Sequence, residues 1–352
     1  RKSLIVHQRL FYFRPMNKAL LIFFSILLFS CGENTPNTSP IMEFTSDLDS
    51  LNTLLEKEPK NLDALSKRAK TLYKNGEFDL AINDIKQKIA ISATDKDYYL
   101  KGNIFFSNLQ IKNNAENANK AYRLCINENP ENANCYVKLA QIQQLLDNYD
   151  KCIQLVDSAL IIDKQLPDAY FMKGLTVELR RAKGASVLAI SSYLTSIELD
   201  PDFYDSYMRL GNLHAAKNDS LAIQYYKSAI YLQPERIEAH YNLAIYLQNS
   251  GKFDNAMKRY DRILEIDPFS FLAQFNQGYL LLVFADQYEQ ATMKFSQSIL
   301  NNPDYTEAYH NRGLCHKNLG RYADARSDFK KALQLNPDFD LSAIQLNEIE
   351  GF

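Results

Sequence analysis

Residues 304–337 read DYTEAYHNRGLCHKNLGRYADARSDFKKALQLNP. Apolar and aromatic side chains recur at helical spacing on either side of Gly320, which predicts two short helices joined by a tight turn. Small residues at Gly313 and Ala325 would let the two helices approach closely, while large aromatic side chains fill the remaining volume. Pro337 ends the second helix, because a proline disfavours the helical conformation in the residue before it.

Prolines recur along the chain at a nearly constant interval. Successive members of the series are separated by 33, 34, 35 and 34 residues, and they are Pro201, Pro234, Pro268, Pro303 and Pro337. Each proline follows a similar helix ending, such as Glu265-Ile266-Asp267 before Pro268. A fixed period of this length predicts a stack of supersecondary units, each of which contacts only its neighbours.

The repeating unit resembles the tetratricopeptide repeat (TPR), in which an aromatic residue, Leu-Gly, Tyr, Ala, a second aromatic residue and a final Pro occupy fixed positions. The last full unit carries Tyr309, Gly313, Gly320, Tyr322, Ala325, Phe329, Ala332 and Pro337 in these positions. The resemblance implies an all-α fold, a right-handed superhelical TPR solenoid of about eight helix-turn-helix repeats. The expected repeats are 61–95, 96–130, 131–165, 166–201, 202–234, 235–268, 269–303 and 304–337.

Both ends of the expected solenoid, residues 44–352, carry additional helical sequence. Leu48, Leu51, Leu54 and Leu55 have helical spacing within 44–59 and predict an unpaired leading helix. Residues 338–352 are interpreted as a C-terminal capping helix, because a solenoid must cover its last apolar face.

The N-terminal region has the pattern of a targeting segment. Met16 and Lys18 precede an apolar run that stops at Ser30-Cys31, and the run is too short to cross about 30 Å of hydrocarbon. The exit sequence Leu28-Phe29-Ser30-Cys31 resembles the lipobox of bacterial lipoproteins. The resemblance implies a signal peptide over 16–30 and lipidation of Cys31, with acyl chains such as palmitate holding the protein on a membrane. An uncleaved anchor and a plain secretory signal are the alternatives.

The segments on either side of this signal differ from it in composition. Residues 1–15 do not begin with Met and are interpreted as an upstream, non-native extension of the reading frame. Residues 31–43 are polar and contain two prolines, which predicts a flexible tether. Gly32 replaces the Asp that favours retention in the inner membrane of some bacteria. We therefore expect a lipoprotein of the bacterial envelope, in the outer membrane, on its periplasmic or surface face.

Charge and motifs exclude several classes of function. From Cys31 onward there are 35 basic and 42 acidic residues (40 − 5 and 42 − 0), and this mildly acidic balance argues against nucleic-acid binding. The chain contains no zinc, P-loop, Gly-x-Ser-x-Gly or dinucleotide-binding motif. His214, His240 and His316 fall in packing positions of the repeat rather than in a ligand set. We expect a protein that is not an enzyme and needs no metal or cofactor.

Four cysteines lie within the repeats. Cys125 and Cys152 take the small-residue position of second helices and are interpreted as buried apolar side chains. Cys135 and Cys315 lie on first helices. An exported protein could oxidise Cys125 with Cys135, but connectivity does not follow from the sequence, so the state of this pair stays open.

In TPR arrays the first helices line the concave surface, and two positions per repeat face the groove. The nearer position is held by Tyr99, Val137, Phe171, Met208, Tyr241, Phe275 and His310. The farther position is held by Asn103, Gln141, Leu175, Asn212, Ile245, Tyr279 and Leu314. This apolar, aromatic and amide surface suits a helix or an extended segment of another protein. The alternative is that several of these residues pack against neighbouring helices.

These observations predict a protein–protein interaction adaptor or scaffold that is lipid-anchored in the bacterial envelope. Its expected partners are other proteins, such as envelope-assembly, secretion or hydrolase components, together with the membrane that holds the lipid. The alternative is a ligand-capturing surface lipoprotein of a nutrient-uptake system, although TPR-bearing nutrient binders interrupt their repeats with a large insertion that this array lacks. The sequence does not determine the partner or the oligomeric state.

Overall fold

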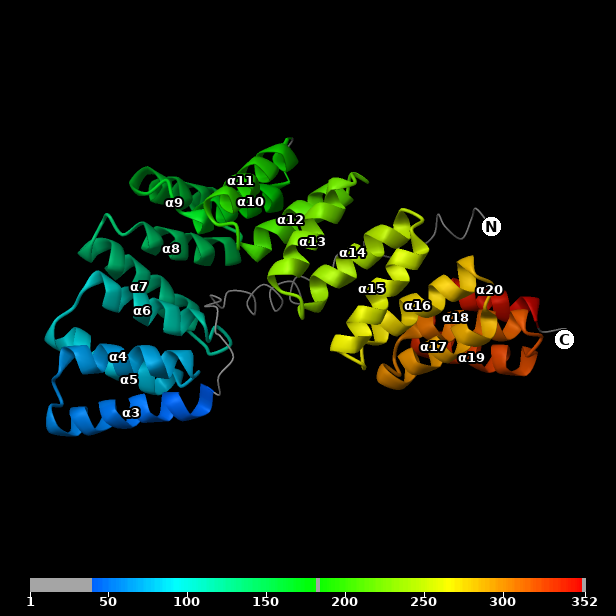
Figure 1. Ribbon diagram of the computed structural model, residues 1–352, viewed down its shortest axis with the longest axis horizontal. Coiled ribbons are helices and arrows are strands. Elements are labelled where there is room, and N and C mark those ends of the chain that lie inside the picture. The colour runs from blue at the N-terminus through cyan, green and yellow to red at the C-terminus, as the bar shows by residue number, and fades with distance from the viewer. Residues whose placement is uncertain (1–39, 182–183, 350–352) are drawn as a thin grey trace. The chain divides into compact units, whose positions relative to one another are not determined.

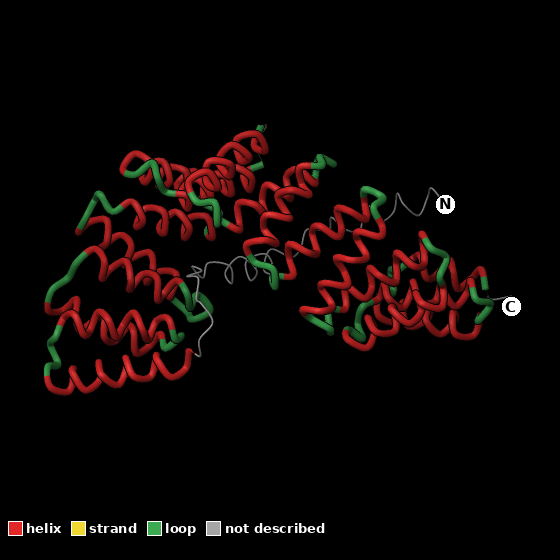
Figure 2. The backbone as a smooth tube through the Cα atoms, in the orientation of Figure 1, coloured by secondary structure: helices red, strands yellow, loops and turns green. Residues whose placement is uncertain are grey.

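The computed structural model describes residues 40–181 and 184–349, with side chains from residue 47 onward. Every regular element in these ranges is an α-helix, as Figure 2 shows. The predicted upstream extension, signal peptide, lipidated Cys31 and most of the predicted tether lie outside the described residues. No helix in the described ranges is both long and apolar enough to span a membrane.

The chain divides into two compact units, with the boundary between Ala189 and Ile190 in α11 (Ala185–Leu199). Unit 1 contains α3 (Pro40–Lys57), α4 (Leu62–Lys74), α5 (Phe78–Ile91), α6 (Asp95–Phe106), α7 (Asn114–Glu128), α8 (Ala133–Leu145), α9 (Tyr149–Ile162) and α10 (Pro167–Arg180). Unit 2 contains α12 (Tyr204–Ala215), α13 (Leu221–Leu232), α14 (Ile237–Asn249), α15 (Phe253–Ile266), α16 (Phe271–Phe284), α17 (Tyr288–Asn301), α18 (Thr306–Asn318), α19 (Tyr322–Leu335) and α20 (Asp340–Glu348).

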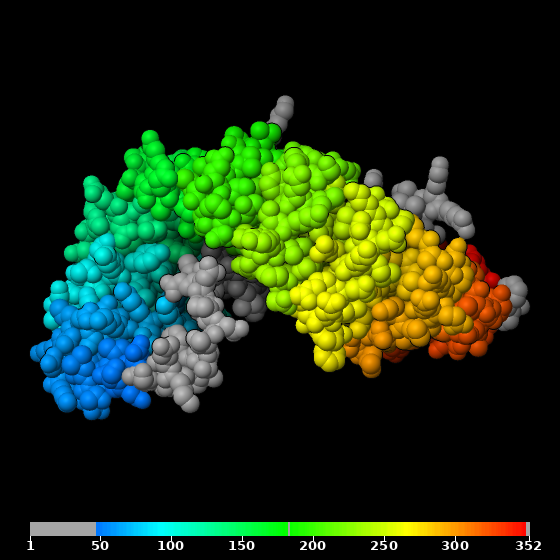
Figure 3. All heavy atoms as spheres, in the orientation of Figure 1, coloured from blue at the N-terminus to red at the C-terminus, as the bar shows by residue number. Residues whose placement is uncertain are grey.

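In chain order, α4 to α19 alternate as the first and second helices of successive repeats, which confirms the predicted all-α repeat fold. Within each unit, a first helix packs on the second helix of its own repeat, and that helix packs on the next first helix (Figure 1). In Figure 3 the colours therefore change in successive bands along each unit. Because each repeat touches only its neighbours, apolar residues form a series of local clusters instead of one central core.

Glycines on the first helices allow these pairs to form. A Cβ added to Gly313 would lie 2.6 Å from the ring of Phe329, and one added to Gly211 would lie 2.5 Å from the ring of Tyr226. A Cβ atom does not approach another carbon this closely in folded proteins. Only glycine therefore lets the aromatic side chain of the second helix lie flat against the first helix. The small–aromatic pattern in the sequence is therefore the cause of the close packing of the helices.

The turns within repeats need the left-handed backbone conformation. Gly251 and Gly320 have φ of 73° and 74°, in the region that glycine enters without steric cost. Asp147 and Asp286 take the same conformation at the corresponding turns, with φ of 57° and 51°. An aspartate is among the few non-glycine residues that tolerate this region, so the turns keep their geometry where glycine is replaced.

Helices α3 and α20 lie at the two ends of the repeats. Helix α3 begins at Pro40, earlier than the Phe44 expected from the leucine spacing, because a proline is well accepted at the first position of a helix. Helix α20 packs on α18 and α19 and buries Phe339 and Ile349. It thereby covers the apolar end of the last repeat.

Candidate protein-binding surface

The fourteen predicted groove positions all lie on first helices, but they differ in exposure. Eight are buried: Val137, Gln141, Phe171, Leu175, Met208, Phe275, Tyr279 and His310. Six are half-buried: Tyr99, Asn103, Asn212, Tyr241, Ile245 and Leu314. Only the half-buried group presents side-chain surface that a partner could reach in this conformation.

The burial of Phe275 shows why these positions differ. Its ring lies 5.5 Å from the ring of Phe295 on the second helix of the same repeat, and 4.9 Å from the ring of Tyr305 at the start of the next repeat. A large side chain at this position therefore fills the joint between repeats. With 3% of its surface exposed, Phe275 stabilises the stack and offers little area to a partner.

His310 is covered by the capping helix. Its Nδ1 lies 3.0 Å from Ser342 Oγ of α20, and its ring lies 5.3 Å from the ring of Phe339. Burial of the imidazole lowers the pKa of His310 to about 4, so the ring is neutral at physiological pH. The predicted groove position at His310 is thus covered by Phe339 and by helix α20 of the same chain.

In unit 2, an amide and tyrosine network joins three consecutive first helices. Asn212 Oδ1 of α12 accepts hydrogen bonds from Tyr226 Oη at 2.8 Å and from Asn242 Nδ2 of α14 at 3.1 Å. Asn276 Nδ2 of α16 donates to Tyr241 Oη at 3.3 Å. The network fixes polar side chains across the joints between repeats, so their positions do not depend on a bound partner.

The half-buried residues of this network, together with half-buried Ile245 on α14, form the candidate site. We call Asn212, Tyr241, Asn242 and Ile245 the α12–α14 surface. Burial raises the pKa of Tyr226, which lies beneath it, far above its ordinary value, so the phenol keeps its proton and donates to Asn212. Because the Asn212 carbonyl accepts twice, its NH₂ group is the part of the amide that is left to donate to a partner.

Unit 1 has a similar arrangement at one position. Tyr122 Oη donates to Asn103 Oδ1 at 2.8 Å, and the ring of Tyr99 lies 6.1 Å from the ring of Tyr122. Gln141, the next amide along the chain at this position, differs from Asn103. Both of its side-chain polar atoms are buried and have no hydrogen-bond partner among the described residues.

Sequence reasoning missed Asn242 and Asn276. Both follow directly after a nearer groove position, and Asn311 does the same in the next repeat. An asparagine at one position in three consecutive repeats is a signal that periodicity could have revealed. Their bonds to Asn212 and Tyr241 could not be inferred, because those partners lie about one repeat away along the chain.

Two of the histidines in the described repeats, His214 and His240, have structural contacts. His240 Nε2 donates to the carbonyl of Pro234 at 2.9 Å, and His214 Nδ1 lies 2.8 Å from Asp219 Oδ2. Among the residues that the structure describes, no three His, Cys, Asp or Glu side chains are grouped so that they could hold a metal ion. The arrangement of the described residues is suited to binding through shape and hydrogen bonds.

Comparisons with known proteins agree with this fold. Family models described as Tetratricopeptide repeat match residues 237–270 and 306–339, which correspond to two of the helix pairs in unit 2. A solved structure titled "Crystal structure of APC/C hetero-tetramer Cut9-Hcn1" aligns with a TM-score of 0.50 at 17% identity, covering 90% of this chain and 60% of that chain. At this identity the likeness shows the fold alone.

Curated relatives also carry these repeats in their names. Tetratricopeptide repeat protein 6 of Homo sapiens is 24% identical over 165 residues, covering 46% of this chain and 31% of the relative. TPR repeat-containing protein MJ1428 of Methanocaldococcus jannaschii is 24% identical over 298 residues, covering 80% and 48%. The chain spans less than half the length of these relatives. The comparisons therefore establish tetratricopeptide repeats, a fold that typically mediates protein–protein interaction.

Proposed function

We propose that this chain is a non-catalytic adaptor that binds a segment of another protein on its first helices and is held in a bacterial envelope by lipid on Cys31. The α12–α14 surface carries the binding part of the proposal. Its tyrosine and isoleucine supply apolar area, while Asn212 and Asn242 supply oriented amides. Such a combination suits a partner that presents both side chains and main-chain carbonyl groups.

Preorganisation favours binding at this surface. Tyr226 and Asn242 fix Asn212, and Asn276 fixes the hydroxyl of Tyr241, before a partner arrives. A partner therefore does not have to immobilise these side chains, a cost of about 0.5–1.5 kcal/mol for each flexible side chain at an interface.

Two observations support the envelope part of the proposal. The apolar run that ends at Ser30-Cys31 has the pattern of a lipoprotein signal, in which Cys31 is the acylated residue. The structure also contains a disulfide bond between Cys125 and Cys135, and such bonds persist in oxidising compartments outside the cytoplasm. Outer-membrane placement and partners from envelope machinery follow from the same proposal.

Site-specific photo-crosslinking in native envelopes tests the binding surface. A photoreactive residue in place of Ile245 should give a covalent adduct of defined mass. The matched control places the same residue at Lys258, an exposed position on the second helix α15 of the same repeat. Adducts of equal yield from both positions, or none from position 245, would remove the α12–α14 surface as the binding site.

A further inference from the structure

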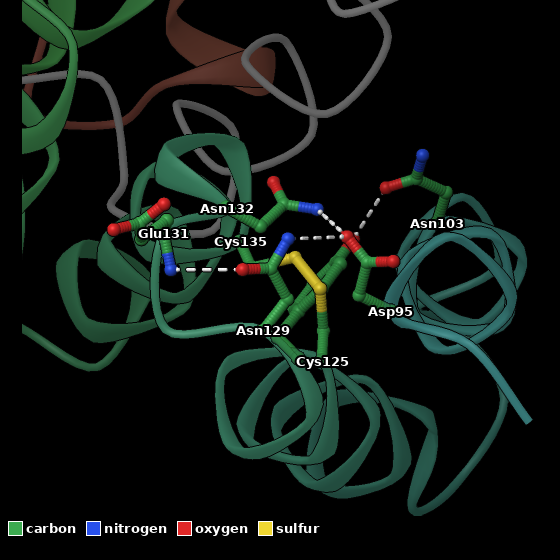
Figure 4. The surroundings of a disulfide bond; sticks show 8 residues. Asp95, Asn103, Cys125, Asn129, Glu131, Asn132 and Cys135 are labelled. Atoms are coloured by element: carbon green, nitrogen blue, oxygen red, sulfur yellow. Dashed lines mark hydrogen bonds between the residues drawn. A yellow bond between two sulfur atoms is a disulfide. The ribbon is translucent and has the colours of Figure 1, made fainter.

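A disulfide bond crosses the joint between the second and third repeats. Cys125 lies on α7, the second helix of one repeat, and Cys135 lies on α8, the first helix of the next (Figure 4). Their Cα atoms are 6.3 Å apart, within the range that a disulfide can bridge. The bond therefore links two helices whose packing sets the relative position of neighbouring repeats.

Hydrogen bonds to α6 also hold residues 129–132, which connect α7 to α8. Asp95, the first residue of α6, accepts from Asn129 Nδ2 at 3.1 Å and from Asn132 Nδ2 at 2.8 Å. Burial alone would raise the pKa of Asp95, but these amide hydrogen bonds outweigh it and hold the pKa below its ordinary value. Residues 129–132 are thus tied to α6 by a carboxylate that stays ionised.

Neither sulfur of the pair is accessible to a reductant in the folded protein. Cys125 and Cys135 both have 0% of their surface exposed. The thiols of Cys152 and Cys315 are also buried, and burial raises the pKa of Cys315 to about 12. A buried, protonated thiol does not attack a disulfide, so neither of these two thiols in the described repeats can rearrange the bond while the repeats stay folded.

We propose that Cys125 and Cys135 are the substrate pair of a disulfide-forming oxidant outside the cytoplasm, and that their bond is a permanent brace between the second and third repeats. The two thiols lose two protons and two electrons as the Sγ–Sγ bond forms, and the oxidant's own disulfide is reduced to two thiols. Because both sulfurs are buried, this exchange takes place before α8 docks on α7. The proposal rests on the export in the proposed function, but not on partner binding.

The brace acts on the predicted binding face of unit 1. Asn103 lies on α6, which Asp95 ties to the connection, and Val137 lies two residues after Cys135 on α8. The covalent bond holds α8 against α7, and the Asp95 hydrogen bonds hold α6 to the residues between α7 and α8. Reduction would leave the packing and the two amide hydrogen bonds as the contacts that resist opening.

Both cysteines lie in the single tryptic peptide 124–138, between Arg123 and Lys138, so alkylation reads their state directly. Full-length protein from native envelopes is denatured with alkylating reagent present, without reductant, and digested. The expected peptide carries no alkyl group until a reductant is added, after which it carries two. Two alkyl groups before reduction would overturn the proposal, as would linkage of either cysteine to Cys152 or Cys315.

The role of the bond is tested by thermal unfolding of two double variants. Cys125→Ala/Cys135→Ala removes the bond, while Cys152→Ala/Cys315→Ala makes the same change at two equally buried thiols. The first variant should unfold about 5–10 °C below the second, and reduced wild-type protein should match the first. Equal unfolding temperatures would overturn the proposal that the bond stabilises the joint between these repeats.

A refolding experiment separates this proposal from export itself. Purified reduced chain is refolded with oxidised glutathione, and peptide 124–138 is examined by the same alkylation. The bond could instead form in this mixture while protein from cells carries free thiols. That result would overturn the proposal that an oxidant outside the cytoplasm forms the bond, while leaving the protein-binding function intact. Bond formation in both samples supports the proposal.

Discussion

Arg312 and Asp328 form a two-point ion pair that joins the two helices of the last repeat. Arg312 Nε donates to Asp328 Oδ2 at 2.9 Å, and Nη2 donates to Oδ1 at 2.7 Å. In the first repeat, Arg68 makes the same two contacts with Asp84, at 2.7 and 2.8 Å. The arginine precedes the aspartate by 16 residues in both repeats, so the pair occupies equivalent positions at the two ends of the array.

Each of these arginines also contacts the element before its repeat. Arg312 Nη1 donates to Ser296 Oγ of α17 at 3.1 Å, and Arg68 Nη1 donates to Asn52 Oδ1 of α3 at 2.9 Å. One guanidinium thus connects three helices, because its planar group offers donors in several fixed directions. In both end repeats this polar link therefore adds a hydrogen bond to the preceding helix beside the ion pair within the repeat.

Replacing Asp328 with Ala should destabilise unit 2 by about 2–3 kcal/mol, since the partly buried guanidinium of Arg312 would lose its counter-charge. The measurement is the denaturant midpoint followed by circular dichroism. Glu265→Ala, which removes an exposed partner of Arg262 in the same unit, should leave the midpoint unchanged. Equal shifts of the midpoint for the two variants would show that the buried ion pair contributes no more to stability than the exposed one.

Replacing Gly313 with Ala should destabilise the last repeat by about 1–3 kcal/mol, although alanine favours a helix, because its Cβ would overlap the ring of Phe329. Combining it with Phe329→Leu should recover stability relative to the sum of the single changes. Ser327→Ala on the exposed side of α19 is the control for helix propensity. Additive losses in the double variant, measured by thermal unfolding, would contradict the steric explanation.

The stability of the capping helix should depend on pH through His310. Its pKa is lowered from 6.5 to about 4 in the folded state, so below pH 6.5 the unfolded state binds more protons. The contribution of neutral His310 to the free energy of unfolding is therefore fully present above pH 6.5. It is lost as pH decreases toward 4, by about 3 kcal/mol in total. The measurement is unfolding of wild type and His310→Phe across this range. The variant should show a flatter pH dependence, and parallel curves would exclude His310 as the source.

Replacing Cys31 with Ser should release the protein from membranes, because serine has no thiol to accept the lipid. The measurement is fractionation of cells into membrane and soluble extracts. Cys152→Ser is a control that changes a buried cysteine of the repeats. Retention of the Cys31 variant in membranes at the wild-type level would count against the lipid anchor.

The repeat fold could be predicted because its determinants are local in the sequence. Gly313 and Phe329 lie within one repeat, and the prolines mark its period directly. Exposure at the groove positions could not be predicted in the same way, because it depends on the next repeat. Phe275 is buried by Tyr305, and His310 is buried by α20, although both occupy the same position as half-buried Tyr241. Position in a repeat identifies the face of a helix, and the size of the neighbours decides how much of that face remains open.

The hydroxyl of Tyr226 offers a test of preorganisation that changes no exposed residue. Tyr226→Phe removes one of the two donors to Asn212 and should cost about 1 kcal/mol of stability, while the Asn212 amide keeps only the hydrogen bond from Asn242 and is held less firmly. We expect the yield of the adduct from position 245 to fall several-fold, because the partner must then fix that amide itself.

The matched control for this change lies in unit 1. Tyr122→Phe removes the corresponding hydroxyl from Asn103, with the same chemical change and a similar cost in stability. Because that contact lies outside the α12–α14 surface, the crosslinking yield from position 245 should stay at the wild-type level. If both variants lowered the yield equally, loss of stability would explain the effect, and the oriented amide of Asn212 would have no part in binding.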